Sequence, residues 1–299
     1  MKMLSKSKIV PIALTILLCA LSAAAAPKND RLNRARNYVL YYGSAGDSEI
    51  RELAKYDVVV IDPQALGGNA KSKIAQLKRK GCFVIGYLSY MEVADWHRYK
   101  NRVPQEWILK VDGKPWVPWG NNQAADLSNP QWRKLLVQLT KSEVIDYGCD
   151  GVFMDTLADI DNPKLPGDMR KKQLAGLEML MKELRVAYPK FVFVGNWTIQ
   201  STLPVMAKYA DIICWENFQA KYFDKGNADY VFANKIRKDL DDQIKKYHFK
   251  VYALWAAPKG DETVREQQRS AKLAESFGYL FYSTTGDYHT GFAFAEKKE

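Results

Sequence analysis

The chain has 299 residues and a formal net charge of +10, with 44 Lys and Arg against 34 Asp and Glu. This length suffices for one large domain with a sizeable core, and the lysines are spread through the predicted helices, which favours a solvated outer surface over a nucleic-acid-binding patch. No CxxC motif occurs and the three histidines are far apart in sequence, so we expect no dedicated zinc site and no other cofactor.

The first residues have the order of a secretory signal. A positive segment, an apolar run and a stretch of small residues follow one another: Lys2, Lys6 and Lys8, then Ile9–Leu21, then Ser22–Ala26. We predict a signal peptide over residues 1–25, with cleavage inside the alanine run but not after Ala26, because Pro27 would follow the cut. The run is too short for a stable membrane span, so the protein is expected to be secreted or periplasmic. Cys19 suggests a lipid anchor, but Leu18 precedes it where a small residue is needed.

Three cysteines remain after the signal, which leaves a charge of +7 once its three lysines are removed. An odd number of cysteines argues against a disulfide scaffold. Cys82 and Cys149 open neighbouring predicted strands, so they can form a disulfide or stay as two buried thiols. Cys214 lies inside a later apolar run.

From residue 38 onward, apolar, β-branched or aromatic runs alternate with helical patterns. The eight runs are Tyr38–Tyr42, Val58–Ile61, Phe83–Tyr87, Gly151–Met154, Phe191–Val194, Ile212–Trp215, Val251–Trp255 and Tyr279–Tyr282. Near-continuous apolar strands are typical of a parallel sheet covered on both faces.

Helical spacing is found between these runs, for example over Pro130–Tyr147 and Glu262–Phe277. Eight strands with alternating helices predict an α/β fold, a (β/α)₈ barrel over residues 38–292. Residues 26–37 would be an N-terminal extension and 293–299 a C-terminal tail, and the eighth helix would be short or missing. An open doubly wound sheet is the competitor, but no glycine-rich phosphate turn follows an early strand.

Polar residues gather where the predicted strands end, which is the active-site face of such barrels. The strand-end residues are Asp62, Ser89, Glu92, Asp155, Asn196, Glu216, Asn217 and Ser283–Thr285. Converging carboxylates raise one another's pKa values, so that one can stay protonated as an acid while another is ionised.

Aromatic residues add to the candidate site. Trp96, Trp107, Trp116 and Trp119 lie in the long segment from Glu92 to Asn129, and three more tryptophans close strands: Trp197, Trp215 and Trp255. Flat rings beside carboxylates and amides suit a sugar, although the same rings can instead cap the barrel core. Our candidate substrate-binding residues are Asp62, Tyr87, Glu92, Trp116, Trp119, Asp126, Asn196, Trp215, Trp255 and Tyr282.

Asp155 and Glu216 stand out as a catalytic pair, because each ends a buried apolar run. Hydrolysis of a glycosidic bond requires one group that protonates the leaving oxygen and another that attacks, or activates water, from the opposite side. The shorter Asp155 suits a nucleophile, and Glu216, set against the Trp215 ring, suits an acid, which predicts a retaining enzyme. The alternative for Asp155 is an ion pair with a barrel Lys or Arg, and Asp150 is expected to be structural.

Four motifs carry a family resemblance. YLSYMEVADW (Tyr87–Trp96), DLSNPQW (Asp126–Trp132), GCDGVFMDT (Gly148–Thr156) and CWEN (Cys214–Asn217) together resemble the endo-α-1,4-polygalactosaminidase family of glycoside hydrolases. The resemblance implies an exported (β/α)₈ barrel that cuts galactosamine-containing polysaccharide within the chain, with its catalytic aspartate at Asp155 and glutamate at Glu216. The family commonly has Gly where Met91 precedes Glu92, so a different pocket is expected there.

A chitinase-like pattern, D-G-x-D-x-D-x-E, fails on the same strand, because Phe153 and Leu157 occupy two of its acidic positions. The sequence therefore predicts a glycosidase with a polysaccharide substrate, no nucleic-acid partner, no stable membrane span and a monomeric state. A glycosidase acting on another amino-sugar or neutral glycan, or a catalytically idle sugar-binding barrel, remains the alternative.

Overall fold

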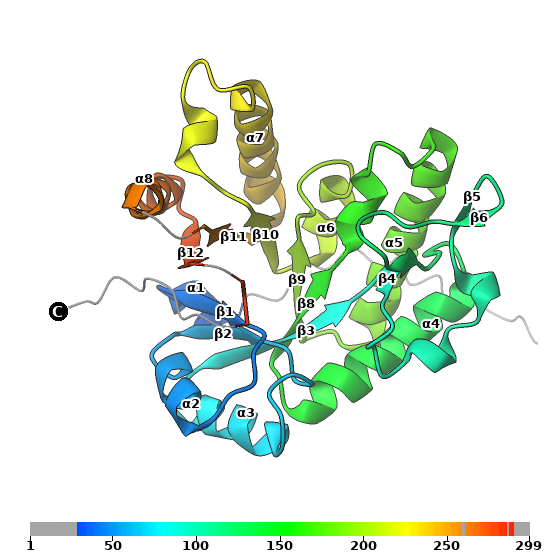
Figure 1. The fold of residues 1–299 in the computed structure, drawn as a ribbon, viewed down its shortest axis with the longest axis horizontal. Helices are drawn as coiled ribbons and strands as arrows, with labels where there is room; N and C mark the ends of the chain where they lie inside the picture. The colour runs from blue at the N-terminus through cyan, green and yellow to red at the C-terminus, as the bar shows by residue number, and fades with distance from the viewer. Residues whose placement is uncertain (1–28, 259–260, 286, 290–299) are drawn as a thin grey trace, which may run out of the picture.

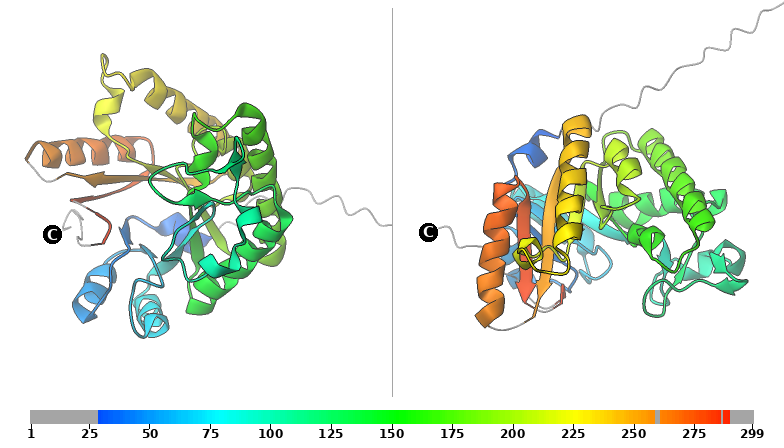
Figure 2. Two further views of the ribbon diagram at one scale, coloured as in Figure 1. Left: turned by 45° about the vertical axis from the view of Figure 1, so that its right-hand side comes forward. Right: turned by 90° about the horizontal axis from the view of Figure 1, so that it is seen from above.

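The structure, a computed structural model, describes residues 29–258, 261–285 and 287–289. Its main sheet has eight parallel strands in the order β1-β2-β3-β8-β9-β10-β11-β12. Their bounds are β1 Tyr38–Tyr41, β2 Val58–Ile61, β3 Phe83–Ser89, β8 Gly151–Asp155, β9 Val192–Asn196, β10 Ile212–Glu216, β11 Lys250–Ala257 and β12 Leu280–Thr285. The sheet curls into a nearly closed barrel with helices outside it (Figures 1 and 2), which confirms the predicted fold class.

The barrel is nearly closed because its first and last strands lie side by side without pairing. Within the described residues, no ladder joins β1 to β12. Instead, the Tyr38 hydroxyl donates to the carbonyl of Ala253 (2.6 Å), and the Tyr42 backbone N–H donates to the carbonyl of Tyr288 (2.7 Å) beyond β12. The segment after β12 therefore folds back toward the end of β1.

The strands form where the apolar runs predicted them, because each run is buried on both faces. All four residues of β2 are apolar and buried, as parallel strands between a barrel core and a helical layer must be. Asp155, Asn196 and Glu216 are the last residues of β8, β9 and β10. The strand ladders thus continue up to these three polar side chains.

Helices follow seven of the strands. Their bounds are α2 Asp47–Leu53, α3 Ala70–Arg79, α4 Pro130–Leu139, α5 Gly167–Ala187, α6 Leu203–Tyr209, α7 Tyr230–Tyr247 and α8 Asp261–Ser276, with a short α1 at Asp30–Arg34 before the barrel. The predicted helix Pro130–Tyr147 is α4 continued by a π-helical turn, Thr140–Val144, and a 3₁₀ turn, Ile145–Tyr147. The described residues after β12 contain no helix, and residues 290–299 lie outside the described part.

The long segment between β3 and α4 contains two short antiparallel strand pairs and lies beside the barrel mouth. A short strand, β4 (Glu92–Val93), pairs with β7 (Gln123–Ala124), and β5 (Lys110–Val111) pairs with β6 (Lys114–Pro115), both antiparallel. The Trp132 indole of α4 donates to the carbonyl of Tyr90 (3.2 Å), which fixes the start of the segment to the helix that follows it.

The three cysteines of the described chain are free, buried thiols. Cys82 and Cys149 therefore do not form the disulfide that the sequence left open. Asp150, at the opening of β8, forms an ion pair with Lys78 (2.8 Å) and accepts a hydrogen bond from the Val84 N–H, as its structural interpretation predicted. No helix in the described part of the chain is long and apolar enough to cross a membrane. The predicted signal peptide lies outside that part.

Candidate active site

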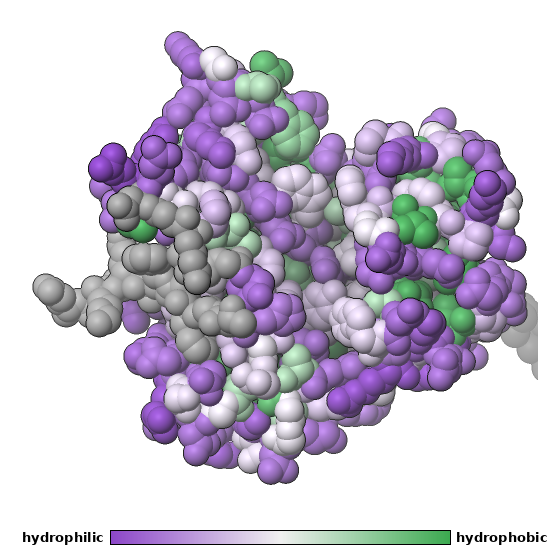
Figure 3. Space-filling view, in the orientation of Figure 1, coloured by the Kyte–Doolittle hydropathy of each residue, from purple (hydrophilic) through white to green (hydrophobic). Residues whose placement is uncertain are grey.

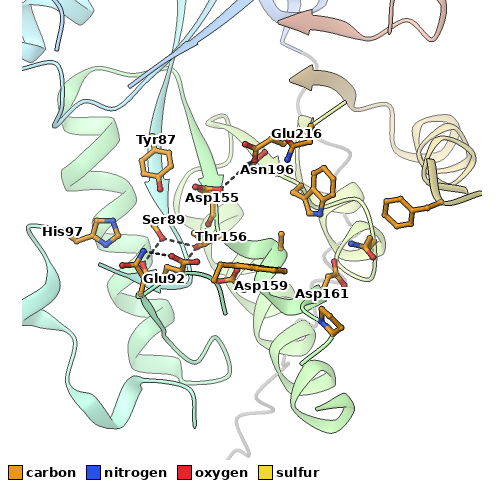
Figure 4. Close-up of a pocket in the computed structure, with 18 of the residues that line it drawn as sticks. Tyr87, Ser89, Glu92, His97, Asp155, Thr156, Asp159, Asp161, Asn196 and Glu216 are labelled. Carbon is orange, nitrogen blue, oxygen red and sulfur yellow. Dashed lines mark hydrogen bonds between the residues drawn. The ribbon is translucent and has the colours of Figure 1, made fainter. Parts of the chain in front are cut away.

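Three adjacent strands bring a carboxylate, an amide and a second carboxylate together at the barrel mouth. The Asn196 side-chain nitrogen donates to Asp155 Oδ1 and to Glu216 Oε2, each at 2.9 Å (Figure 4). Since both oxygens lie that close to one nitrogen, they are separated by no more than twice 2.9 Å. The structure therefore places the two predicted catalytic residues side by side on one rim.

Neutral hydroxyl groups provide further hydrogen bonds to the two carboxylates. Tyr87, on β3, is hydrogen-bonded to Asp155, and the Tyr288 hydroxyl donates to Glu216 Oε1 (3.0 Å). Among the ion pairs of the described residues, none involves Asp155 or Glu216. The alternative of a barrel Lys or Arg bound to Asp155 is thus not what the structure shows.

The backbone turns sharply after each of these strands. Thr156, Trp197 and Asn217, the residues immediately after β8, β9 and β10, all have positive φ values, of 66°, 50° and 57°. A left-handed conformation costs a non-glycine residue about 1–2 kcal/mol, and such strained residues cluster at functional sites. The turns keep Asp155, Asn196 and Glu216 at the very ends of their strands, facing the mouth.

The pKa of Glu216 is raised by burial and, next, by the charge of Asp155, while hydrogen bonds from Asn196 and Tyr288 lower it. A buried carboxyl beside a like charge keeps its proton to higher pH. The Trp215 ring, which the sequence analysis placed against Glu216, instead packs against Phe218 and Phe223. Successive side chains of a strand point to opposite faces, so Trp215 and Glu216 do not share one.

A cavity of about 890 Å³, here called the mouth cavity, opens above the pair. The molecular face is visibly hollowed there (Figure 3). Tyr87, Glu92, Trp119, Asp155, Asn196 and Glu216, all predicted site residues, line it. Three tryptophans are among the lining residues. Trp96 (64%) and Trp119 (58%) are largely exposed to solvent, and Trp197 is half-buried.

A smaller cavity of about 190 Å³, the inner cavity, lies deeper and shares Asp155 and Glu216 with the mouth cavity. It is lined by Asp62, which was predicted, and by two tyrosines that were not, Tyr42 and Tyr288. The rings of Tyr42 and Tyr87 lie 4.8 Å apart. Burial raises the pKa of Asp62, against hydrogen bonds from the backbone of Gln64 and Ala65.

Acidic groups dominate one side of the mouth cavity. Asp159 is only 2% exposed, and burial, followed by the charges of Glu92 and Asp155, raises its pKa to about 9, although a hydrogen bond from Trp119 opposes the shift. Burial also raises the pKa of Glu92, against a hydrogen bond from Asn122 (2.8 Å). At neutral pH Asp159 therefore holds a proton.

Three buried polar atoms that line the mouth cavity have no hydrogen-bond partner within the described chain: His97 Nε2, Asp159 Oδ2 and Asn196 Oδ1. Burial lowers the pKa of His97 to about 4, so its ring is neutral. Because His97 Nδ1 accepts from the Ala94 N–H (3.0 Å), Nε2 carries the proton. A buried polar atom without a partner is costly, and a bound polar molecule would supply these partners.

Five predicted substrate-binding residues lie outside both cavities. Trp116, Trp215, Trp255 and Tyr282 are at most 7% exposed and pack in the interior; the Tyr282 ring, for example, lies 5.7 Å from that of Tyr38. Asp126 accepts hydrogen bonds from Ser128 and Gln173 and lines a separate cavity of about 360 Å³. Of the two roles considered for the tryptophans, these three have the structural one: they pack in the interior and do not line either cavity.

Several lining residues were absent from the sequence prediction, among them Tyr42, His97, Asp159 and Tyr288. Tyr42 was within reach of the strand-end rule, because it closes the first predicted run. His97 and Asp159 are loop residues that only tertiary packing buries, and Tyr288 follows the last strand.

The sequence model of glycoside-hydrolase family GH114 matches residues 19–231 of the chain. Comparison with curated protein sequences gave no match.

Several solved structures share the fold. The glycoside hydrolase domain of PelA from Pseudomonas aeruginosa superposes with a TM-score of 0.68 at 20% identity, covering 86% of this chain and 98% of that one. Aspergillus fumigatus Ega3, solved in complex with galactosamine, gives 0.59 at 16% identity, covering 85% and 93%. An α-galactosidase from Thermus thermophilus gives 0.52 at 16% identity, covering 85% and 58%.

Proposed function

The chain belongs to glycoside-hydrolase family GH114, and on that premise we propose that it cleaves internal α-1,4 bonds of a galactosamine-containing polysaccharide with retention of configuration. One observation carries the proposal: a single Asn196 nitrogen lies 2.9 Å from both Asp155 and Glu216. Retaining glycosidases have carboxyl groups about 5–5.5 Å apart, whereas inverting enzymes need about 6.5–9.5 Å to admit a water. The shared amide favours the narrower spacing.

In the first step Asp155 attacks the anomeric carbon, and the bond from that carbon to the leaving oxygen breaks while Glu216 gives its proton to that oxygen. In the second step Glu216 takes a proton from water, the hydroxide attacks the same carbon, and the Asp155 carboxylate is released. Asn196 and Tyr288 orient Glu216, and Tyr87 with Asn196 orients Asp155. Burial and Asp155 raise the pKa of Glu216, which favours the protonated form that an acid catalyst needs.

The acidic wall of the mouth cavity supports an amino sugar as substrate. Glu92 and Asp155 provide carboxylates, and Asp159 has an oxygen without a partner in the described chain. A protonated amine on the sugar would be attracted to the two carboxylates and could donate a hydrogen bond to the free oxygen of Asp159, and the exposed Trp119 ring offers a face for the C–H side of a sugar. Met91 stands where the family commonly has Gly. Its side chain is fully buried and does not line the mouth cavity, so we expect the substrate to contact Glu92 but not Met91.

The location and the oligomeric state are also part of the proposal. The protein is secreted or periplasmic, its signal peptide of residues 1–25 is cleaved inside the alanine run but not after Ala26, and it acts as a monomer. Mass spectrometry of the protein recovered from its producing cell gives the mature N-terminus. Retention of residues 1–25 would overturn the export proposal without touching the chemistry.

The decisive experiment incubates the purified protein with partly deacetylated polygalactosamine and with chitosan. We expect a rapid fall in chain length on polygalactosamine, new reducing ends, and initial products that keep the α-configuration by NMR. Depolymerisation of chitosan or a neutral glycan instead would establish the runner-up substrate class. Binding without cleavage of any glycan would identify a catalytically idle barrel, and an initial β-product would exclude the nucleophile.

A further inference from the structure

The mouth cavity continues into a further cavity of about 640 Å³ between α6 and α7, here called the outer groove. The two cavities share Asp161, Gln200 and Phe232, so their surfaces are continuous. We propose that the outer groove binds the sugar units on the reducing-end side of the cleaved bond. This inference rests on the proposed function and adds the place where the leaving part of the chain lies.

The outer groove has the surface chemistry of a sugar-binding site. Phe232, in the first turn of α7, is an exposed aromatic residue (39%) at the junction of the two cavities. The amide of Gln200 and the hydroxyl of Ser201 lie on the facing side. Sugars bind where a ring can cover their C–H face and polar groups can reach their hydroxyls. Figure 3 shows apolar atoms on the α7 side of the hollow.

The groove lies on the side of the general acid. Glu216 ends β10, and the chain then runs through the turn Ala220–Phe223 into α7, which carries Phe232. In Figure 4, Tyr87, Glu92 and His97 lie on one side of Asp155, whereas Glu216 and Asp161 lie on the other. A general acid protonates the oxygen of the leaving sugar, so the leaving sugar and the units after it extend toward α7.

The charges of the outer groove differ from those of the mouth cavity. Asp239 is paired with Lys235 (2.5 Å), and the Asp161 carboxylate accepts hydrogen bonds from Ser201 and Thr202. Asp242 likewise pairs with Lys238 (2.8 Å), and Arg170 adds a cation to the lining of the groove. By contrast, Glu92 and Asp159 of the mouth cavity form no ion pair in the described residues. The groove consequently binds sugar units whether or not their amines are acetylated, and selection for a free amine belongs to the mouth cavity.

Reducing-end-labelled galactosamine oligosaccharides of graded length test this assignment in the full-length protein. For the wild type, kcat/KM should rise with each of the first units added on the reducing-end side of the cleaved bond. Phe232→Ala should abolish that rise, lowering kcat/KM on long substrates roughly 5- to 100-fold by analogy with ring stacking on bases. An activated aryl α-galactosaminide, whose leaving group does not reach the groove, should be cleaved at the wild-type rate.

Two matched variants complete the design. Val231→Ala changes the neighbouring residue, which is 77% exposed and lines neither cavity, and should leave every rate unchanged. Phe232→Tyr keeps the ring and should keep the dependence on length. An unchanged profile in Phe232→Ala, or an equal loss on aryl and long substrates, overturns the inference while the proposed function stands. A wild type that cleaves no glycan overturns both.

Discussion

The two ends of the barrel contain the same kind of side chain in opposite surroundings. At the amino ends of the strands, Asp57, Asp150 and Asp211 precede β2, β8 and β10, and each accepts a hydrogen bond from a backbone N–H and pairs with a base. At the carboxyl ends, Asp155 and Glu216 bind only neutral donors among the described residues.

The difference separates stability from chemistry. Each amino-end acid joins a backbone N–H and a basic side chain from other parts of the chain, so these acids fasten neighbouring strand ends together. The mouth acids lack that partner, and burial beside like charge leaves Glu216 and Asp159 with raised pKa values. Perturbed acids in a cavity are the mark of a functional site. Substitutions at the two ends should therefore fail in different assays.

The largest effects are expected at the mouth. Asp155→Asn and Glu216→Gln should each lower kcat about 10²–10⁴-fold or more, with little change in the melting temperature. With an activated aryl glycoside, bond cleavage should persist in Glu216→Gln, because that leaving group needs little protonation, and should fail in Asp155→Asn. Asp150→Asn, at the other end of the same strand, is the control and should keep its kcat. The reverse pattern on the aryl glycoside would exchange the two roles.

The next effect belongs to the amino end. The Arg185–Asp211 pair is buried (2.7 Å; side chains 15% and 5% exposed), so Asp211→Ala should lower the free energy of unfolding by about 3–5 kcal/mol and leave the kcat of the folded enzyme intact. Asp57→Ala breaks a pair that is far more exposed (76% and 38%) and should cost at most about 1 kcal/mol. Denaturant titration measures both, and equal losses would contradict the argument from burial.

A third prediction concerns Asp159. Its raised pKa means that the folded chain binds this proton more tightly than the unfolded chain. The free energy of unfolding should therefore fall as the pH rises from about 4 toward about 9. Asp159→Asn has no proton to lose and should lack this slope, which is at most about 1.4 kcal/mol per pH unit. Asp161→Asn should keep the slope. If the pH dependence of unfolding is the same in Asp159→Asn and wild type, Asp159 is not the titrating group.

The sequence predicted those features of the structure that depend on neighbouring residues in the chain, and missed those that depend on tertiary packing. The strands could be predicted because buried parallel strands are continuous apolar runs, and the strand-end rule then placed Asp155, Asn196 and Glu216 together. It could not decide which way Trp215 and Trp255 point, because a run that is apolar on both faces hides the alternation of side chains. Asp159 and His97 acquire their burial from the long segment after β3, which no local pattern reveals.

Tyr288 was unpredictable for the same reason, since its place depends on the segment after β12 folding back over the mouth, and it provides the smallest and most specific test. Its hydroxyl donates to Glu216 Oε1 (3.0 Å) and so lowers the pKa of Glu216, which burial and Asp155 raise. In Tyr288→Phe the ionised form loses this support, so the pKa of Glu216 rises further. Since catalysis requires the protonated acid, the alkaline limb of kcat/KM should move to higher pH, by about half to one unit.

Tyr42→Phe is the control. It removes a hydroxyl from the same inner cavity but no bond to Glu216, whose partners in the described chain are Asn196 and Tyr288, and it should leave the alkaline limb in place. A purely packing role for Tyr288 would instead lower the rate equally at every pH.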